Sequence, residues 1–199
     1  MKHLIFIILF FVAFVAKSQL NKKTWLVGGS GSFNSYKENY QSNIVETVYK
    51  VTDVTISPNI GYFIVDKFAV GLKSTLSWRK DKGVSTNVVG NSSTTLRVDY
   101  GPFVRYYFLD KGKSVNILAD LSYQFGNVKF KGIDKGSRNN FSIMAGPAIY
   151  FNSSVGLEFL FGYRYESEKE TTTTHPNPYK DTKKGIQLGI ALQIHLEKL

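Results

Sequence analysis

Residues 185–196 read GIQLGIALQIHL, and apolar side chains occupy every second position of this stretch. The apolar set is Ile186, Leu188, Ile190, Leu192, Ile194 and Leu196. Successive side chains of a β-strand point to opposite faces, so this spacing predicts a strand with one apolar face and one face of polar or small residues. No long segment after residue 24 shows helical spacing, which favours an all-β fold.

The same alternation recurs along the rest of the chain and predicts eight strands. They span Thr24–Phe33, Val54–Val65, Ala69–Trp78, Thr94–Phe108, Ser114–Phe125, Asn140–Phe151, Val155–Tyr165 and Gly185–Leu196. The connections 66–67, 109–113 and 152–154 are short, whereas 34–53, 79–93, 126–139 and 166–184 are long. Short turns on one side and long loops on the other are typical of bacterial outer-membrane barrels.

The polar face decides between two all-β architectures. A soluble, lipocalin-like barrel would turn its apolar face inward, and a membrane barrel would turn it toward lipid. The polar face carries many glycines and few charges, which suits a crowded lumen better than a solvated exterior. Aromatic residues near strand ends on the apolar side fit interfacial girdles: Trp25, Tyr62, Trp78, Tyr100, Tyr106, Tyr123, Tyr163 and Tyr165. We therefore expect a transmembrane barrel.

The N-terminus has the pattern of a secretory signal peptide. Lys2 precedes an apolar run from Leu4 to Ala16, and Ala16 and Ser18 supply the small residues of a cleavage site. The run is shorter than the roughly 20 residues that a membrane-spanning helix needs, which disfavours an N-terminal anchor. We expect residues 1–18 to be removed and residues 19–199 to form the barrel domain. Without Lys2 and Lys17, 23 basic residues remain against 15 acidic ones, a net charge of +8.

A weak repeat places a proline after a small residue in three strands. Ser57-Pro58, Gly101-Pro102 and Gly146-Pro147 are each followed by alternating apolar or aromatic positions. Proline lacks the N–H that a strand ladder uses, so we expect a β-bulge beside each one.

These features together resemble the small outer-membrane β-barrel family, similar to OmpA and OmpX barrels, over residues 24–196. The resemblance implies an eight-stranded antiparallel up-and-down barrel in the cell outer membrane, inserted by the barrel assembly machinery. It says little about activity, because such barrels include adhesins, anchors, enzymes and assembly factors.

Seven charged residues are expected to face the lumen: Lys73, Arg97, Asp99, Arg105, Asp120, Glu158 and Arg164. An eight-stranded barrel is only wide enough for side chains to fill, so these charges should form a buried ion-pair network. We expect Arg105 to pair with Glu158, and Asp99 with Arg164 or Arg97. On this hypothesis Glu158→Ala should lower resistance to unfolding more than Asp134→Ala in a loop. The alternative is a narrow channel for small solutes or ions.

Other chemistries receive little support. The absence of cysteine excludes disulfides, thiolate metal sites and thiol nucleophiles. Two histidines remain after cleavage, His175 in a long loop and His195 near the short-turn rim, and neither suits a lipid-modifying enzyme. We predict no catalytic, metal or cofactor site and no nucleic-acid partner. A monomer is expected, in contact with outer-membrane lipid and lipopolysaccharide, with loops that bind an extracellular ligand.

Overall fold

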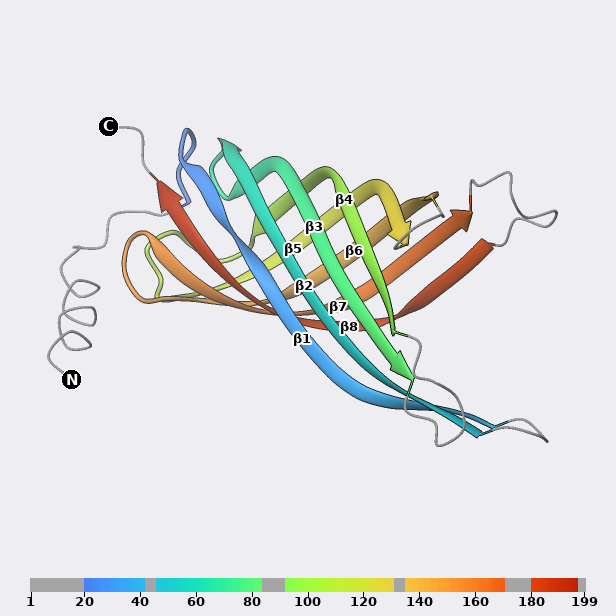
Figure 1. Ribbon diagram of the computed structural model, residues 1–199. Coiled ribbons are helices and arrows are strands. Elements are labelled where there is room, and N and C mark those ends of the chain that lie inside the picture. Colours follow the sequence, from blue (N-terminus) through green and yellow to red (C-terminus); the bar gives the residue numbers. More distant parts are fainter. Residues whose placement is uncertain (1–19, 42–45, 84–91, 131–134, 171–179, 197–199) are drawn as a thin grey trace, which may run out of the picture.

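The computed structural model describes residues 20–41, 46–83, 92–130, 135–170 and 180–196, which form one closed antiparallel barrel (Figure 1). Each strand pairs with the next in the chain, and β8 pairs with β1. The strands are β1 (Trp25–Gln41), β2 (Glu46–Val65), β3 (Phe68–Gly83), β4 (Ser92–Tyr107), β5 (Val115–Phe130), β6 (Lys135–Tyr150), β7 (Val155–Glu170) and β8 (Lys180–Leu196). The prediction of an eight-stranded up-and-down barrel is confirmed. Among the described residues, no helix is long and apolar enough to cross a membrane.

The strands extend farther toward the long loops than the sequence predicts. β2 begins at Glu46 rather than Val54, and β7 continues past Tyr165 to Glu170. These extensions are polar, so they lack the apolar alternation that marks a lipid-facing strand, but their backbones still pair. The loops predicted at 34–53, 79–93, 126–139 and 166–184 are therefore longer than the connections between the observed strands. The segments 42–45, 84–91, 131–134 and 171–179 lie outside the described residues.

The apolar face points outward, as a membrane barrel requires. Leu188 on β8 is 76% exposed and Leu72 on β3 is 63% exposed. Inside the barrel, Arg105, Asp120 and Glu158 are all at most 2% exposed. This arrangement inverts that of a soluble barrel, in which the buried side chains are mainly apolar.

The expected bulges beside the prolines are wrong. The β6–β7 pairing passes from Ala145↔Phe161 to Ala148↔Glu158 with no shift of register at Pro147. Pro58 and Pro102 likewise interrupt pairing on one side without a shift, and the register shift seen in β2 lies at Phe63/Val65. The missing proline N–H thus removes ladder hydrogen bonds locally while the strands keep their alignment.

The short-turn end of the barrel is covered by residues just before β1. Leu20 is 1% exposed and packs with Leu26 and Phe63 inside that end. The Lys67 amide donates to the Leu20 carbonyl (2.9 Å), and the Lys22 amide donates to Asp66 Oδ1 (2.7 Å). Lys111 Nζ also binds the Asp66 carboxylate, and these hydrogen bonds lower the pKa of Asp66 below its usual value. The contacts join residues 20–22 to the β2–β3 turn.

Gly146 is a position where only glycine fits, and this can be tested. A Cβ there would overlap the Phe159 carbonyl oxygen of β7. Gly146→Val should therefore lower the free energy of unfolding by about 1–3 kcal/mol, the usual range for overpacking. The measurement is the urea concentration at which the faster-migrating band of the folded barrel disappears from a gel of unboiled samples. Gly189→Val is the matched control, because a Cβ at Gly189 meets only Leu160 Cβ at 4.0 Å. Equal losses in both variants would contradict the steric explanation.

Candidate functional site

The lower lumen, toward the short turns, is crossed by a buried ion-pair layer centred on Arg105 of β4. Its Nε and Nη2 donate to Asp120 Oδ2 on β5 at 3.0 and 2.9 Å, and its Nη1 donates to Glu158 Oε1 on β7 at 3.0 Å. Tyr107 adds a hydroxyl hydrogen bond to the same Glu158 oxygen (3.1 Å). The expected pairing of Arg105 with Glu158 is present, and Asp120 joins it.

Lys73 of β3 completes the charge balance of this layer. Its Nζ lies 2.5 Å from Asp120 Oδ1, so two cations face two carboxylates. The Phe103 ring lies beneath both cations, 5.3 Å from Lys73 Nζ and 5.5 Å from Arg105 Cζ. A neutral, fully paired set is what a buried ionic cluster needs, because an uncompensated charge would be strongly destabilising.

Aromatic rings fill the lumen between this layer and the short turns. Phe63, Tyr107 and Tyr150 surround His195, with ring centroids 5.7, 6.1 and 5.5 Å from the imidazole. His195 is 2% exposed and therefore sealed inside the barrel. His175 lies outside the described residues.

A second charged layer lies higher, and here the sequence-based pairing is wrong. Asp99 is contacted by Arg138 of β6 (Nη1–Oδ2 3.3 Å) rather than by Arg164 or Arg97. Arg164 binds Glu166 (2.7 Å), which also accepts Arg138 Nη2 (2.6 Å). Arg97 binds Glu168 (3.1 Å).

Arg138, Glu166 and Glu168 were missed because they lie on the polar extensions of β6 and β7. From the sequence they belong to the expected loops 126–139 and 166–184, whereas in the structure Arg138 is a 5% exposed strand residue. Continuing the period of two past Tyr165 would have placed Glu166 and Glu168 on the same face as Arg164.

Uncharged side chains connect the two layers. Gln124 of β5 donates from Nε2 to the Lys73 carbonyl (3.0 Å), and its Oε1 accepts from Thr75 (3.1 Å) and Asn140 (3.2 Å). Asn140 Oδ1 in turn accepts from Arg164 Nε (3.1 Å). The lower lumen is thus tied to the upper layer by continuous hydrogen bonds.

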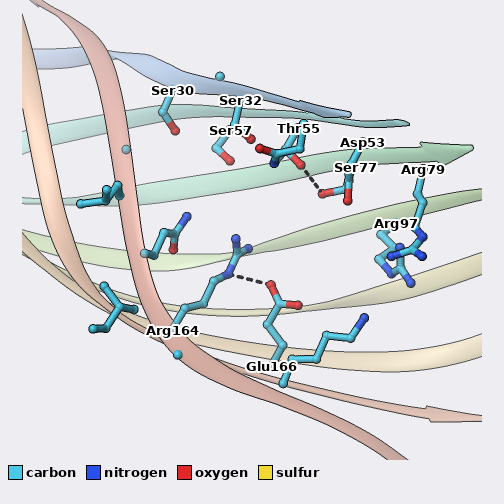
Figure 2. Close-up of a pocket in the computed structure, with 18 of the residues that line it drawn as sticks. Ser30, Ser32, Asp53, Thr55, Ser57, Ser77, Arg79, Arg97, Arg164 and Glu166 are labelled. Atoms are coloured by element: carbon cyan, nitrogen blue, oxygen red, sulfur yellow. Dashed lines mark hydrogen bonds and ion pairs between the residues drawn. The ribbon is translucent and has the colours of Figure 1, made fainter. Parts of the chain in front are cut away.

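Above the lower layer, a polar cavity of about 500 Å³ extends toward the long loops (Figure 2). Serine and threonine hydroxyls from β1, β2 and β3 form one wall, and Arg97, Arg164 and Glu166 face them (Figure 2). Thr55 and Ser77 are hydrogen bonded to each other at 3.0 Å within the hydroxyl wall.

The predicted interfacial aromatics lie on the outer surface of the barrel. Seven of them are at least 36% exposed: Trp25, Trp78, Tyr100, Tyr106, Tyr123, Tyr163 and Tyr165. Tyr62 is half-buried because its ring packs edge-on against Trp25, with centroids 5.0 Å apart.

A closed barrel with an apolar exterior, exposed aromatics and an ion-paired interior defines an integral membrane β-barrel. The chain belongs to the outer membrane protein beta-barrel domain family, whose model matches residues 4–196. Its fold is similar to the outer membrane protein OprG from Pseudomonas aeruginosa, with a TM-score of 0.56 and 11% identity over 92% of this chain and 100% of that one. No curated protein sequence matches the chain significantly.

The buried layer leads to a stability prediction for Glu158→Ala. Removing this carboxylate leaves Arg105 undercompensated in the lumen, so the free energy of unfolding should fall by about 3–5 kcal/mol. The urea midpoint of the unboiled gel band measures the loss.

Asp134, the comparison residue suggested by the sequence, lies outside the described residues, so Asp110→Ala serves as the control. Asp110 is 82% exposed and pairs with Lys67 at 3.2 Å, and its loss should cost less than about 1 kcal/mol. A Glu158→Ala variant as stable as Asp110→Ala would contradict the network.

Proposed function

We propose that this protein is a monomeric, non-conducting outer-membrane barrel that acts through ligand binding on its long-loop side. The observation that carries the proposal is the lower lumen layer of Arg105, Asp120, Glu158 and Lys73. All four side chains are largely buried, and each ion is in contact with its counter-ion. Together with the aromatic rings around His195, the layer fills the lumen across its width.

Passage of an ion or solute would require these pairs to separate. Breaking a buried pair leaves charges without partners, at a cost of several kcal/mol per site. An eight-stranded barrel is only wide enough for side chains to fill where no cavity is present, as at the level of this layer. Both facts support a filled barrel over the alternative of a narrow channel.

The polar cavity supports binding on the opposite side. It lies above the ion-pair layer and is lined by hydroxyl and guanidinium groups, which recognise polar ligands. A catalytic role gains no support from His195, whose imidazole is enclosed by Phe63, Tyr107 and Tyr150. We therefore propose interaction rather than lipid modification as the role of this barrel.

The orientation follows from the family and the turn lengths. In outer-membrane barrels short turns face the periplasm and longer loops face the outside. On this proposal residues 1–18 direct export and are removed, the barrel assembly machinery inserts the domain, and lipopolysaccharide surrounds its outer half.

Conductance in planar lipid bilayers tests the filled lumen. The wild-type barrel, reconstituted and shown to be folded by its heat-shifted gel band, should give no steady single-channel events in concentrated KCl. A combined variant, Lys73→Ser, Arg105→Ser, Asp120→Ser and Glu158→Ser with Tyr107→Ala and Tyr150→Ala, removes equal numbers of positive and negative charges and hollows out both the layer and the aromatic rings beneath it. It should show channel openings that the wild type lacks. Stable openings of the wild-type barrel would overturn the proposal in favour of the channel.

A further inference from the structure

The seam between β1 and β8 is paired over only part of its length. It runs from Trp25↔Leu196 to Ser30↔Ala191, whereas β1 pairs with β2 along the whole of Trp25–Gln41. Beyond that point residues 31–41 and 180–190 are strand edges with no partner strand at the seam. Figure 1 shows β1 and β8 diverging toward the long loops.

The open part of the seam lies at membrane depth. On β8 the outward residues from Leu196 up to Ile186 are apolar, and Ile186 and Leu188 are 75% and 76% exposed. At about 3.3 Å per residue and a tilt of about 40°, this stretch rises about 25 Å, the height of a barrel's apolar band. Pairing ends near its middle, at Ala191. The open seam therefore faces the leaflet nearest the long loops.

Unpaired strand edges are not stable against hydrocarbon, because each free N–H or C=O costs several kcal/mol. The polar cavity lies directly behind this opening and is lined by residues of both edges, including Ser32 on β1 and Gln187 and Gly189 on β8. A molecule in the opening would thus meet lipid on one side and polar groups on the other. This is the environment of an amphiphile's headgroup.

The cavity offers donors suited to a phosphate group. Arg97 and Arg164 both line the cavity, and each is bound through its Nε to a carboxylate, Glu168 at 3.1 Å and Glu166 at 2.7 Å. Lys183 and Lys184 lie on the β8 edge of the same cavity. Guanidinium forks match phosphate oxygens in geometry as well as charge. Of the eight charged side chains that line the cavity, six are basic and only Asp53 and Glu166 are acidic. The excess of positive charge favours an anion there, although the Glu166 carboxylate lies on the arginine wall.

We propose that this cavity holds the phosphorylated headgroup of an outer-leaflet lipid that enters sideways between β1 and β8. Its acyl chains remain in the bilayer beside Leu188 and Ile186, and its phosphate lies against Arg164 and Arg97. The inference rests on the proposed function and names the ligand class of that binding side.

The chain has no cysteine, so a disulfide can be used to close the seam. If the β1–β8 register continued past Ser30↔Ala191, Phe33 would lie opposite Leu188. Phe33→Cys with Leu188→Cys should lock the seam when oxidised and release it when reduced. The control pair, Val27→Cys with Ile194→Cys, lies where the strands are already paired.

A second variant blocks the cavity without a disulfide. Gly189→Trp fills it from β8, where an added Cβ would meet only Leu160 Cβ at 4.0 Å, and Leu192→Trp on the lipid-facing side is its control. Each variant is first shown to fold by its heat-shifted gel band, so a misfolded protein is not scored as a non-binder.

The measurement is native mass spectrometry of the folded barrel in dodecylmaltoside with diphosphorylated lipid A. Dephosphorylated lipid A and inorganic phosphate are the comparison ligands. The wild type should retain one lipid A, and dephosphorylated lipid A should bind at least about tenfold more weakly, as expected for loss of a charge-assisted contact. The oxidised lock and Gly189→Trp should lose the lipid, and Arg164→Gln should weaken it. Both controls should bind as the wild type does.

Three outcomes would overturn the proposal. Equal binding of dephosphorylated lipid A would show that phosphate is not recognised. Lipid binding unchanged by Gly189→Trp would place the lipid on the outer surface. Inorganic phosphate bound as tightly as lipid A would indicate a soluble anion that enters from the long-loop side. None of these results bears on the filled lower lumen, whereas conduction by the wild type would overturn the proposed function whatever the lipid result.

Discussion

The buried Arg105 guanidinium, held between Asp120 and Glu158, is the interaction on which the lumen depends. At the level of this layer, side chains fill the interior of the eight-stranded barrel, so polar residues that face inward there must satisfy one another. Arg105 contributes donors to carboxylates on two other strands, β5 and β7, and Lys73 balances the second negative charge. Four strands are thereby joined across the lumen by contacts that the backbone ladder does not provide.

Glycines make this cluster sterically feasible. A Cβ at Gly61 or Gly71 would collide with the Phe103 ring, so these positions must lack side chains for the ring to lie there. Phe103 in turn lies beneath Lys73 and Arg105, where its ring face is attracted to both cations. The small residues of the polar face thus create the space that an aromatic ring fills, and the ring supports the charges.

The sequence predicted the strand segments that face lipid, where every outward residue must be apolar. It missed the polar extensions of the strands beyond the membrane. Alternation marks Ile186 to Leu196 because every outward position there must be apolar, whereas Glu46 to Asp53 can pair as strand with no such restriction. The pairing of Arg105 with Glu158 was predicted correctly because both residues lie near the short turns, on strands whose alternation of apolar and polar residues is clear. Asp99 was not, because its partner Arg138 lies on a polar strand extension that is indistinguishable from a loop by composition.

The filled lumen and the closed seam end at the same level. Ala191 is the last β8 residue paired with β1, and on its other side it pairs with Glu158, which belongs to the ion-pair layer. Below this level the strands are held by ladder hydrogen bonds on both sides and by ion pairs across the interior. Above it the lumen contains a cavity, and β1 and β8 are no longer paired. The ion-pair layer and the paired part of the seam therefore lie in one half of the barrel, and the polar cavity and the unpaired part of the seam lie in the other.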